Sequence, residues 1–188
     1  MARWETGATG RLEGAALDLF RKQGFENTTV AQIAESAGLT ERTFFRHFAD
    51  KREVLFGGTH VLEDLLVAAV AAAPRSRTPI DAVVAALCEA EPMLDERRER
   101  AMVREQVIAS NTELQERNAM KLASMSRGLT DALRERGTDD AVAALAADAG
   151  VSVFKLAFRR WIDPDNGDTF SSHVNSAVDD LRSLTIGG

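Results

Sequence analysis

The chain has 188 residues, of which 45% are hydrophobic and 28% charged, so it suits a globular protein of one domain or two small ones and not a disordered chain. No apolar run approaches the roughly 20 residues of a membrane span, and the opening residues MARWETGATGR lack the apolar stretch of a secretory signal. The single cysteine, Cys88, excludes an internal disulfide framework, so we expect a cytoplasmic protein that does not act at a membrane.

The net charge of −6 is unevenly distributed. Residues 1–55 hold eight Lys or Arg and eight Asp or Glu, so they carry no net charge. The other 15 basic and 21 acidic residues all lie C-terminal to them. Because DNA responds to the local surface, the basic residues between positions 40 and 52 are compatible with a DNA partner.

The hydrophobic pattern has a helical period throughout. In the first part of the chain we expect helices from about Leu12 to Gly24, from Val30 to Ala37, from Thr40 to Phe48 and from Asp50 to Ala73. After the linker PRSRTP, further helices fit residues 79–90, 95–109, 112–136, 138–162 and 167–185. The sequence therefore predicts an all-α protein.

Residues 34–48 have the spacing of a helix-turn-helix. Ala34 lets a second helix cross closely, Gly38 permits a positive φ in the turn, and Leu39 fills the gap. Phe44 and Phe48 are four residues apart, so both rings can enter the core of a three-helix head. The residues between and before them project outward and are available to contact a partner.

The first 60 or so residues resemble the TetR family of bacterial transcriptional regulators. The family's landmarks occur in order: GAALDLF from Gly14, QGF from Gln23, TTV from Thr28, IA from Ile33, AGL from Ala37, TFFRHF from Thr43, and Lys51. The resemblance implies a helix-turn-helix DNA-binding head over residues 8–68. It also implies a helical effector-binding and dimerisation body over residues 69–188, and repression that a small effector usually relieves.

The resemblance also implies which residues lie along double-stranded DNA: Thr29, Thr40, Thr43, Phe45, His47 and Lys51. Thr29 and Thr40 stand at helix N-termini, which favour phosphate, and Lys51 is expected to hold a phosphate as a point charge. The best candidates for base edges are Arg42, Thr43 and Arg46, since arginine can bind guanine through two hydrogen bonds. Glu41 either accepts a hydrogen bond from cytosine or favours the helix N-terminus.

Phe45 stands where many relatives carry tyrosine in the recognition helix, and this chain has no tyrosine at all. A phenylalanine cannot donate a hydrogen bond to phosphate. We therefore expect its ring either to pack against a sugar or thymine methyl group or to pack within the head.

The body is expected to serve two binding roles. Helices between Val61 and Leu133 would surround a mainly apolar effector, with these residues as candidate lining: Met93, Met102, Val103, Val107, Met120, Leu122 and Met125. The two C-terminal helices are expected to form a homodimer, which would bind a palindromic operator. The candidate dimer face is Ala143, Ala144, Ala147, Val151, Phe154, Phe158 and Trp161. The same residues could instead cover the core of their own chain.

Other singled-out residues have structural interpretations. Cys88 is expected to be a small buried residue, and His173 a surface residue. His60 with Glu63 and Asp64 lacks the further ligands of a metal site, and no catalytic motif stands above background, so we expect no metal, no cofactor and no enzyme activity. Two alternatives stay open: a regulator without a small-molecule effector, and a helical carrier or enzyme that keeps a TetR-like head.

Overall fold

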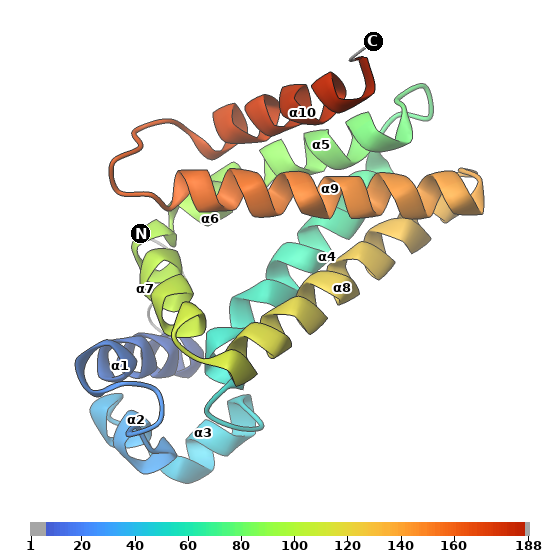
Figure 1. Ribbon diagram of the computed structural model, residues 1–188. Coiled ribbons are helices and arrows are strands. Elements are labelled where there is room, and N and C mark those ends of the chain that lie inside the picture. The colour runs from blue at the N-terminus through green and yellow to red at the C-terminus, as the bar shows by residue number, and fades with distance from the viewer. Residues whose placement is uncertain (1–6, 187–188) are drawn as a thin grey trace. The chain divides into compact units, whose positions relative to one another are not determined.

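The computed structural model describes residues 7–186, and this part of the chain is helical, without strands. The elements are α1 (Ala8–Gln23), α2 (Val30–Ser36), α3 (Glu41–His47), the 3-10 turn η1 (Glu53–Leu55), α4 (Gly57–Ala72), α5 (Pro79–Glu89), α6 (Glu91–Asp95), α7 (Arg98–Ala109), α8 (Thr112–Glu135), α9 (Asp140–Trp161) and α10 (Phe170–Ile186) (Figure 1). The all-α prediction is confirmed.

The long helix expected from Asp50 begins seven residues later, at Gly57. The Asp50 carboxylate accepts hydrogen bonds from the backbone N–H groups of Arg52 (2.8 Å) and Glu53 (3.0 Å), which starts η1 instead of an α-helix. Phe56 ends that turn with φ −115° and ψ 0°. A second difference is α6, which occupies the expected break at Glu91-Pro92, because proline fits the first turn of a helix.

The helices form two compact units, and each unit is discontinuous in sequence. The first, which we call the head, ends at His60 and resumes over Arg98–Asn118. The second, the body, comprises Val61–Arg97 and the chain from Ala119 onward. These units differ from the predicted ranges 8–68 and 69–188, because α7 and the first turns of α8 pack with the head.

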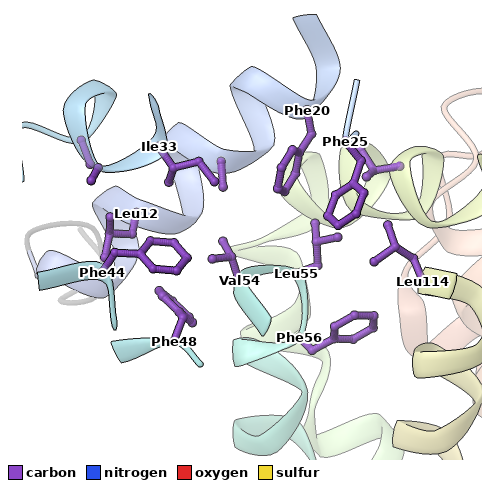
Figure 2. Close-up of a cluster of buried hydrophobic side chains, with 14 of the residues drawn as sticks. Leu12, Phe20, Phe25, Ile33, Phe44, Phe48, Val54, Leu55, Phe56 and Leu114 are labelled. Carbon is purple, nitrogen blue, oxygen red and sulfur yellow. The ribbon is translucent and has the colours of Figure 1, made fainter. Parts of the chain in front are cut away.

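The head is held together by one cluster of large apolar side chains. Figure 2 shows rings and branched chains from α1, α2, α3 and η1 converging with Leu114 from α8. Val107 and Ile108 of α7 belong to the same cluster and are 7% and 3% exposed. The three short N-terminal helices alone bury only part of this core, and α7 and α8 supply the rest.

The body is built around α9, which packs against both α5 and α10 (Figure 1). At the crossing of α9 and α5 there is no space for a side chain: a Cβ placed on Gly150 would lie 2.3 Å from Val83 Cγ1. Toward the C-terminal end of α9, Phe154, Trp161 and Phe170 form a ring cluster with centroids 5.9–6.1 Å apart for the pairs that include Phe170. Close backbone approach thus fixes the middle of α9, and aromatic contacts fix its C-terminal part.

The central position of α9 explains its composition. By length and hydropathy alone (1.7 over an 18-residue window) it is the one helix in the described chain that could cross a membrane, which corrects the expectation that no run was apolar enough. Core helices of soluble proteins pass the same test, and nine residues of α9 are buried. Its hydropathy therefore carries no argument for a membrane span.

Two residues of the body differ from their expected surroundings. His173, expected at the surface, is 5% exposed, and its buried Nε2 has no hydrogen-bond partner among the described residues. It lies one turn into α10, whose inner face packs on α9 and α5, so the helix register buries it. Cys88 is half-buried, and this burial raises the pKa of its thiol.

Candidate nucleic-acid interface

Two threonines start the two helices of the helix-turn-helix. Thr29 Oγ1 accepts a hydrogen bond from the N–H of Gln32 (3.2 Å), while Gln32 Oε1 accepts one from the N–H of Thr29 (2.9 Å), which completes a capping box. Thr40 Oγ1 accepts from the N–H of Thr43 (3.2 Å) and caps α3 in the same way. Both predicted caps are confirmed.

The turn between α2 and α3 also follows the sequence prediction. Gly38 has φ +65°, a value that residues with a Cβ rarely adopt. Its N–H donates to the carbonyl of Glu35 (2.9 Å), and the N–H of Leu39 donates to the carbonyl of Ala34 (2.8 Å), so the last carbonyls of α2 are satisfied. Leu39 then packs against the head core.

α3 separates an inner aromatic face from an outer charged one. Phe44 and Phe48 are 0% and 4% exposed, with ring centroids 5.5 Å apart, as the spacing predicted. Phe45 points the other way and is 55% exposed, although its edge still contacts the Phe44 ring. The surface beside it is formed by Glu41, Arg42, Arg46 and His47, all of which are exposed.

The outer residues differ in how firmly the head already holds them. Neither Arg42 nor Arg46 has a hydrogen bond or ion pair within residues 7–186. His47 Nδ1 lies 3.2 Å from Thr9 Oγ1 of α1, and Thr43 Oγ1 lies 3.1 Å from Thr40 Oγ1. Two arginines are therefore available to an external partner, whereas the histidine and the threonine are partly engaged inside the head.

Lys51 does not have the surroundings expected of a free phosphate ligand. Its ammonium group donates to the backbone carbonyls of Phe25 (2.8 Å), Thr28 (3.1 Å) and Glu26 (3.3 Å). It also lies 4.4 Å from the centroid of the Phe25 ring. Nor does it start the long helix, which begins at Gly57. The head thus already engages the ammonium group that was expected to hold a phosphate as a point charge.

A polar cluster around Arg52, which follows α3 in the chain, was missed in the sequence analysis. The Arg52 side chain binds the carboxylates of Asp50 and Glu113. Burial raises the pKa of Asp50, but hydrogen bonds from the Arg52 side chain and the Glu53 N–H outweigh it and hold the pKa below its ordinary value. The Asp-x-x-Glu spacing could have signalled the local turn; the partner 61 residues away left no sequence signal.

Further along, two arginines flank the buried ring of Phe56. The guanidinium carbons of Arg104 and Arg117 lie 5.0 and 5.9 Å from its centroid. Arg104 also donates to Asn118 Oδ1 at 3.0 Å, and burial lowers the pKa of its guanidinium group, which the neighbouring Glu105 opposes. This cluster joins α7 and the start of α8 to the end of η1, immediately before α4.

The residues predicted to line an effector site divide between the head and the body. Val103 and Val107 pack in or against the head core, and Met102 belongs to the same unit. Met120 is 72% exposed on α8. Within the body, Met125 is buried, and Met93 and Leu122 are half-buried. The sequence prediction places α7 in the body, whereas the apolar face of α7 packs in the head, and the effector site stays a prediction.

Most of the predicted dimer face lies inside the single chain, which supports the alternative that these residues cover their own core. These residues are at most 8% exposed within the single chain: Ala143, Ala147, Val151, Phe154 and Trp161. Ala144 and Phe158 are half-buried. Because α5 and α10 both pack on α9, the chain covers this face itself. Among the described side chains of α9 and α10, the large apolar ones that are exposed are Val142, Leu145 and Leu184.

Comparison with known proteins places both parts of the chain. Residues 14–56 match the family model of bacterial regulatory proteins of the tetR family. Residues 77–184, more than half of the chain, match the model of the MftR C-terminal domain. The first match covers α2, α3 and most of α1, and the second runs from α5 nearly to the end of α10.

The proteins similar to this chain include one characterised by its sequence and two by their solved structures. The HTH-type transcriptional regulator TcmR of Streptomyces glaucescens is 44% identical over 68 residues, which are 36% of this chain and 30% of TcmR, so the match spans under a third of that protein. A TetR-family regulator from Syntrophomonas wolfei has a TM-score of 0.68 at 13% identity over 96% of this chain and 95% of its own. SmeT, the repressor of the Stenotrophomonas maltophilia SmeDEF efflux pump, has a TM-score of 0.61 at 20% identity over 95% and 90%. Two family models in sequence and the shared fold lead to one conclusion: this chain belongs to the tetR family of bacterial regulatory proteins.

Proposed function

We propose that this protein is a sequence-specific, DNA-binding transcriptional regulator, which acts as a repressor that a small, mainly apolar effector releases from its operator. The observation that carries the proposal is the outer face of α3, where Arg42 and Arg46 have no partner within the described chain and flank the exposed ring of Phe45. If this seven-residue helix enters the major groove, the two arginines and the phenylalanine are exposed because they contact base edges there.

The contacts on DNA divide by chemistry. Arg42 and Arg46 are the proposed readers of guanine, since a guanidinium group matches the O6 and N7 acceptors. Phe45 is the proposed apolar contact, suited to a thymine methyl group because its ring offers no hydrogen bond. Glu41, Thr43 and His47 are proposed to support these contacts, and Thr29 and Thr40 to bring helix N-termini toward the backbone.

We also propose a homodimer, because a two-fold protein presents two copies of α3 to successive major grooves. The exposed residues Val142 and Leu145 lie three positions apart on α9 and are 48% and 71% exposed. They replace the buried alanines as the proposed contact. The expected operator is an imperfect palindrome, and the expected place of action is the cytoplasm.

The proposed effector site lies in the body. Of the candidate lining, Met93, Leu122 and Met125 remain in the body and are at least half-buried. Such residues suit an apolar ligand. Binding would lower DNA affinity through a coupling of about 1–3 kcal/mol.

The test starts from a pool of random double-stranded DNA, selected on the purified protein and sequenced. We expect enrichment of a palindromic motif. Arg46→Ala should weaken binding to that motif by about 1–3 kcal/mol per contacted base and relax the preference at one symmetric position. If the wild-type protein enriches no motif, the proposed function is wrong. If Arg46→Ala leaves both affinity and preference unchanged, α3 does not read the bases.

A further inference from the structure

The ammonium group of Lys51 has all its donors engaged by one short turn. The carbonyl oxygens of Phe25, Thr28 and Glu26 lie 2.8, 3.1 and 3.3 Å from Nζ. An ammonium group carries three N–H donors, so three carbonyls exhaust its capacity. The Phe25 ring centroid lies 4.4 Å from Nζ, so the ring also covers part of the ammonium group. We call this arrangement the Lys51 clamp.

The turn that the clamp grips leads directly into α2. Thr28 is 1% exposed and donates from Oγ1 to the carbonyl of Gly24 at 2.8 Å, and the next residue, Thr29, is the N-cap. Gln23, at the end of α1, also donates a hydrogen bond from Nε2 to the carbonyl of Asn27 at 3.1 Å. Without the ammonium group, the three converging carbonyls would lose the donor they share, and within the described residues only that of Phe25 would keep a backbone partner, the N–H of Thr28 at 3.3 Å.

The clamp also connects two parts of the chain that lie on either side of the helix-turn-helix. α3 ends at His47, and Lys51 follows it by four residues, whereas the gripped turn precedes α2. The segment after the recognition helix is thereby tied to the segment before its partner helix. We propose that Lys51 is a positioning residue for DNA recognition, which sets where α2 begins and how α3 is presented. This inference rests on the proposed function.

The geometry discriminates between lysine and arginine. A tetrahedral ammonium group can direct its donors to three carbonyls around one point, whereas a guanidinium group is planar and larger. Arginine is at least as good as lysine for phosphate. Lys51→Arg therefore separates the two roles: it should preserve a phosphate contact but break the clamp.

The experiment compares Lys51→Ala, Lys51→Arg and the control Lys22→Ala, which removes the same charge from an exposed position in the last turn of α1. The probes are the DNA motif selected by the wild-type protein and a scrambled duplex, each titrated over a salt series. Melting temperature and amide hydrogen exchange of residues 28–33 are measured without DNA.

We expect both Lys51 variants to melt about 3–8 °C lower and to exchange the amides of residues 28–33 faster. Affinity for the selected motif should fall about tenfold at a temperature where the variants remain folded. The affinity for scrambled DNA and the slope of log K against log salt should match those of the wild type. Lys22→Ala should change neither the melting temperature nor the exchange.

Two results would overturn the inference. In one, Lys51→Arg behaves as the wild type, while Lys51→Ala weakens both DNAs equally and lowers the salt slope by about one per lost contact, as a phosphate ligand would. In the other, exchange at residues 28–33 does not change. If the wild-type protein selects no DNA, the proposed function fails, and the exchange and melting data still decide whether Lys51 fixes the start of α2.

Discussion

Arg104 of α7 holds the end of η1 through its backbone: Nε donates to the carbonyl of Leu55 at 2.6 Å. The next residue is Phe56, and the guanidinium group of Arg104 stacks over its buried ring. One side chain from α7 thus binds both the backbone and the ring immediately before α4 begins at Gly57.

Arg104→Ala should therefore lower the free energy of unfolding by about 1.5–3 kcal/mol, because it leaves a buried carbonyl without its charged donor. Arg104→Lys should recover little of this, since one ammonium group cannot replace the planar fork. Urea denaturation measures both changes. Arg127→Ala, at an exposed position of α8, is the control and should stay within about 0.5 kcal/mol of the wild type. An equal effect of Arg104→Ala and Arg127→Ala would contradict this role.

Phe44 and Phe45 are adjacent in sequence and should respond oppositely to truncation. Phe44→Ala opens a cavity in the head core and should cost about 3–5 kcal/mol of stability. Phe45→Ala removes a ring that is 55% exposed, so it should cost about 1 kcal/mol or less but weaken binding to the selected DNA motif. Melting curves and titrations of the two variants separate stability from binding. Equal melting temperatures would show that the inner and outer faces of α3 are wrongly assigned.

At the α5–α9 crossing, a smaller side chain at Val83 should compensate for a larger one at Gly150. Gly150→Ala would place a methyl group 2.3 Å from Val83 Cγ1, which should destabilise the body by about 1–3 kcal/mol. Val83→Ala alone should also destabilise, through a cavity. The double variant should be more stable than the sum of the two single effects predicts, and a double-mutant cycle measures that coupling. Additive effects would mean that the crossing relaxes elsewhere.

Assembly can be separated from folding on α9. Leu145→Glu changes a side chain that is 71% exposed, so it should convert a dimer to a monomer of about 20.4 kDa with little loss of helicity. Ala147→Glu buries a charge at a position that is 0% exposed and should unfold the body. Light scattering and circular dichroism distinguish the outcomes. A wild-type protein that is already monomeric would remove the dimer from the proposal.

The acid sensitivity of the head should depend on Asp50. Its pKa in the folded chain is lowered, so the unfolded chain binds the proton more tightly, and the stabilisation is complete above the ordinary value of 3.8. It is lost as the pH falls below 3.8 through the folded pKa. Asp50→Asn should weaken the head at pH 6 and flatten the loss of stability below pH 4. Urea midpoints across this range check the effect, with Asp95→Asn at an exposed site as the control.

Local rules were sufficient for much of the head. The caps at Thr29 and Thr40, the positive φ of Gly38 and the opposite faces of Phe44 and Phe45 each depend on neighbours within a few residues. These interactions have recognisable spacing, so the sequence predicted them.

What covers an apolar face, or binds a charge, depends on residues far along the chain. The apolar stripe around Ala147 could not reveal whether α10 or a second chain would pack on it, and Val107 could not reveal which unit it completes. Lys51 is bound by carbonyls 23 to 26 residues earlier, and backbone carbonyls leave no mark in a sequence. Long-range packing decided all three cases.

The head is assembled from two stretches of chain, the second of which arrives only after residue 97. A fragment that stops at residue 68, the predicted end of the DNA-binding domain, would expose the side of the core that Val107, Ile108 and Leu114 cover. Swapping this reading head onto another regulator therefore requires transplanting α7 and the first turns of α8 as well. During synthesis, the core of the head can form completely only after the ribosome has added Asn118. The DNA-binding end is therefore encoded first but completes its folding late.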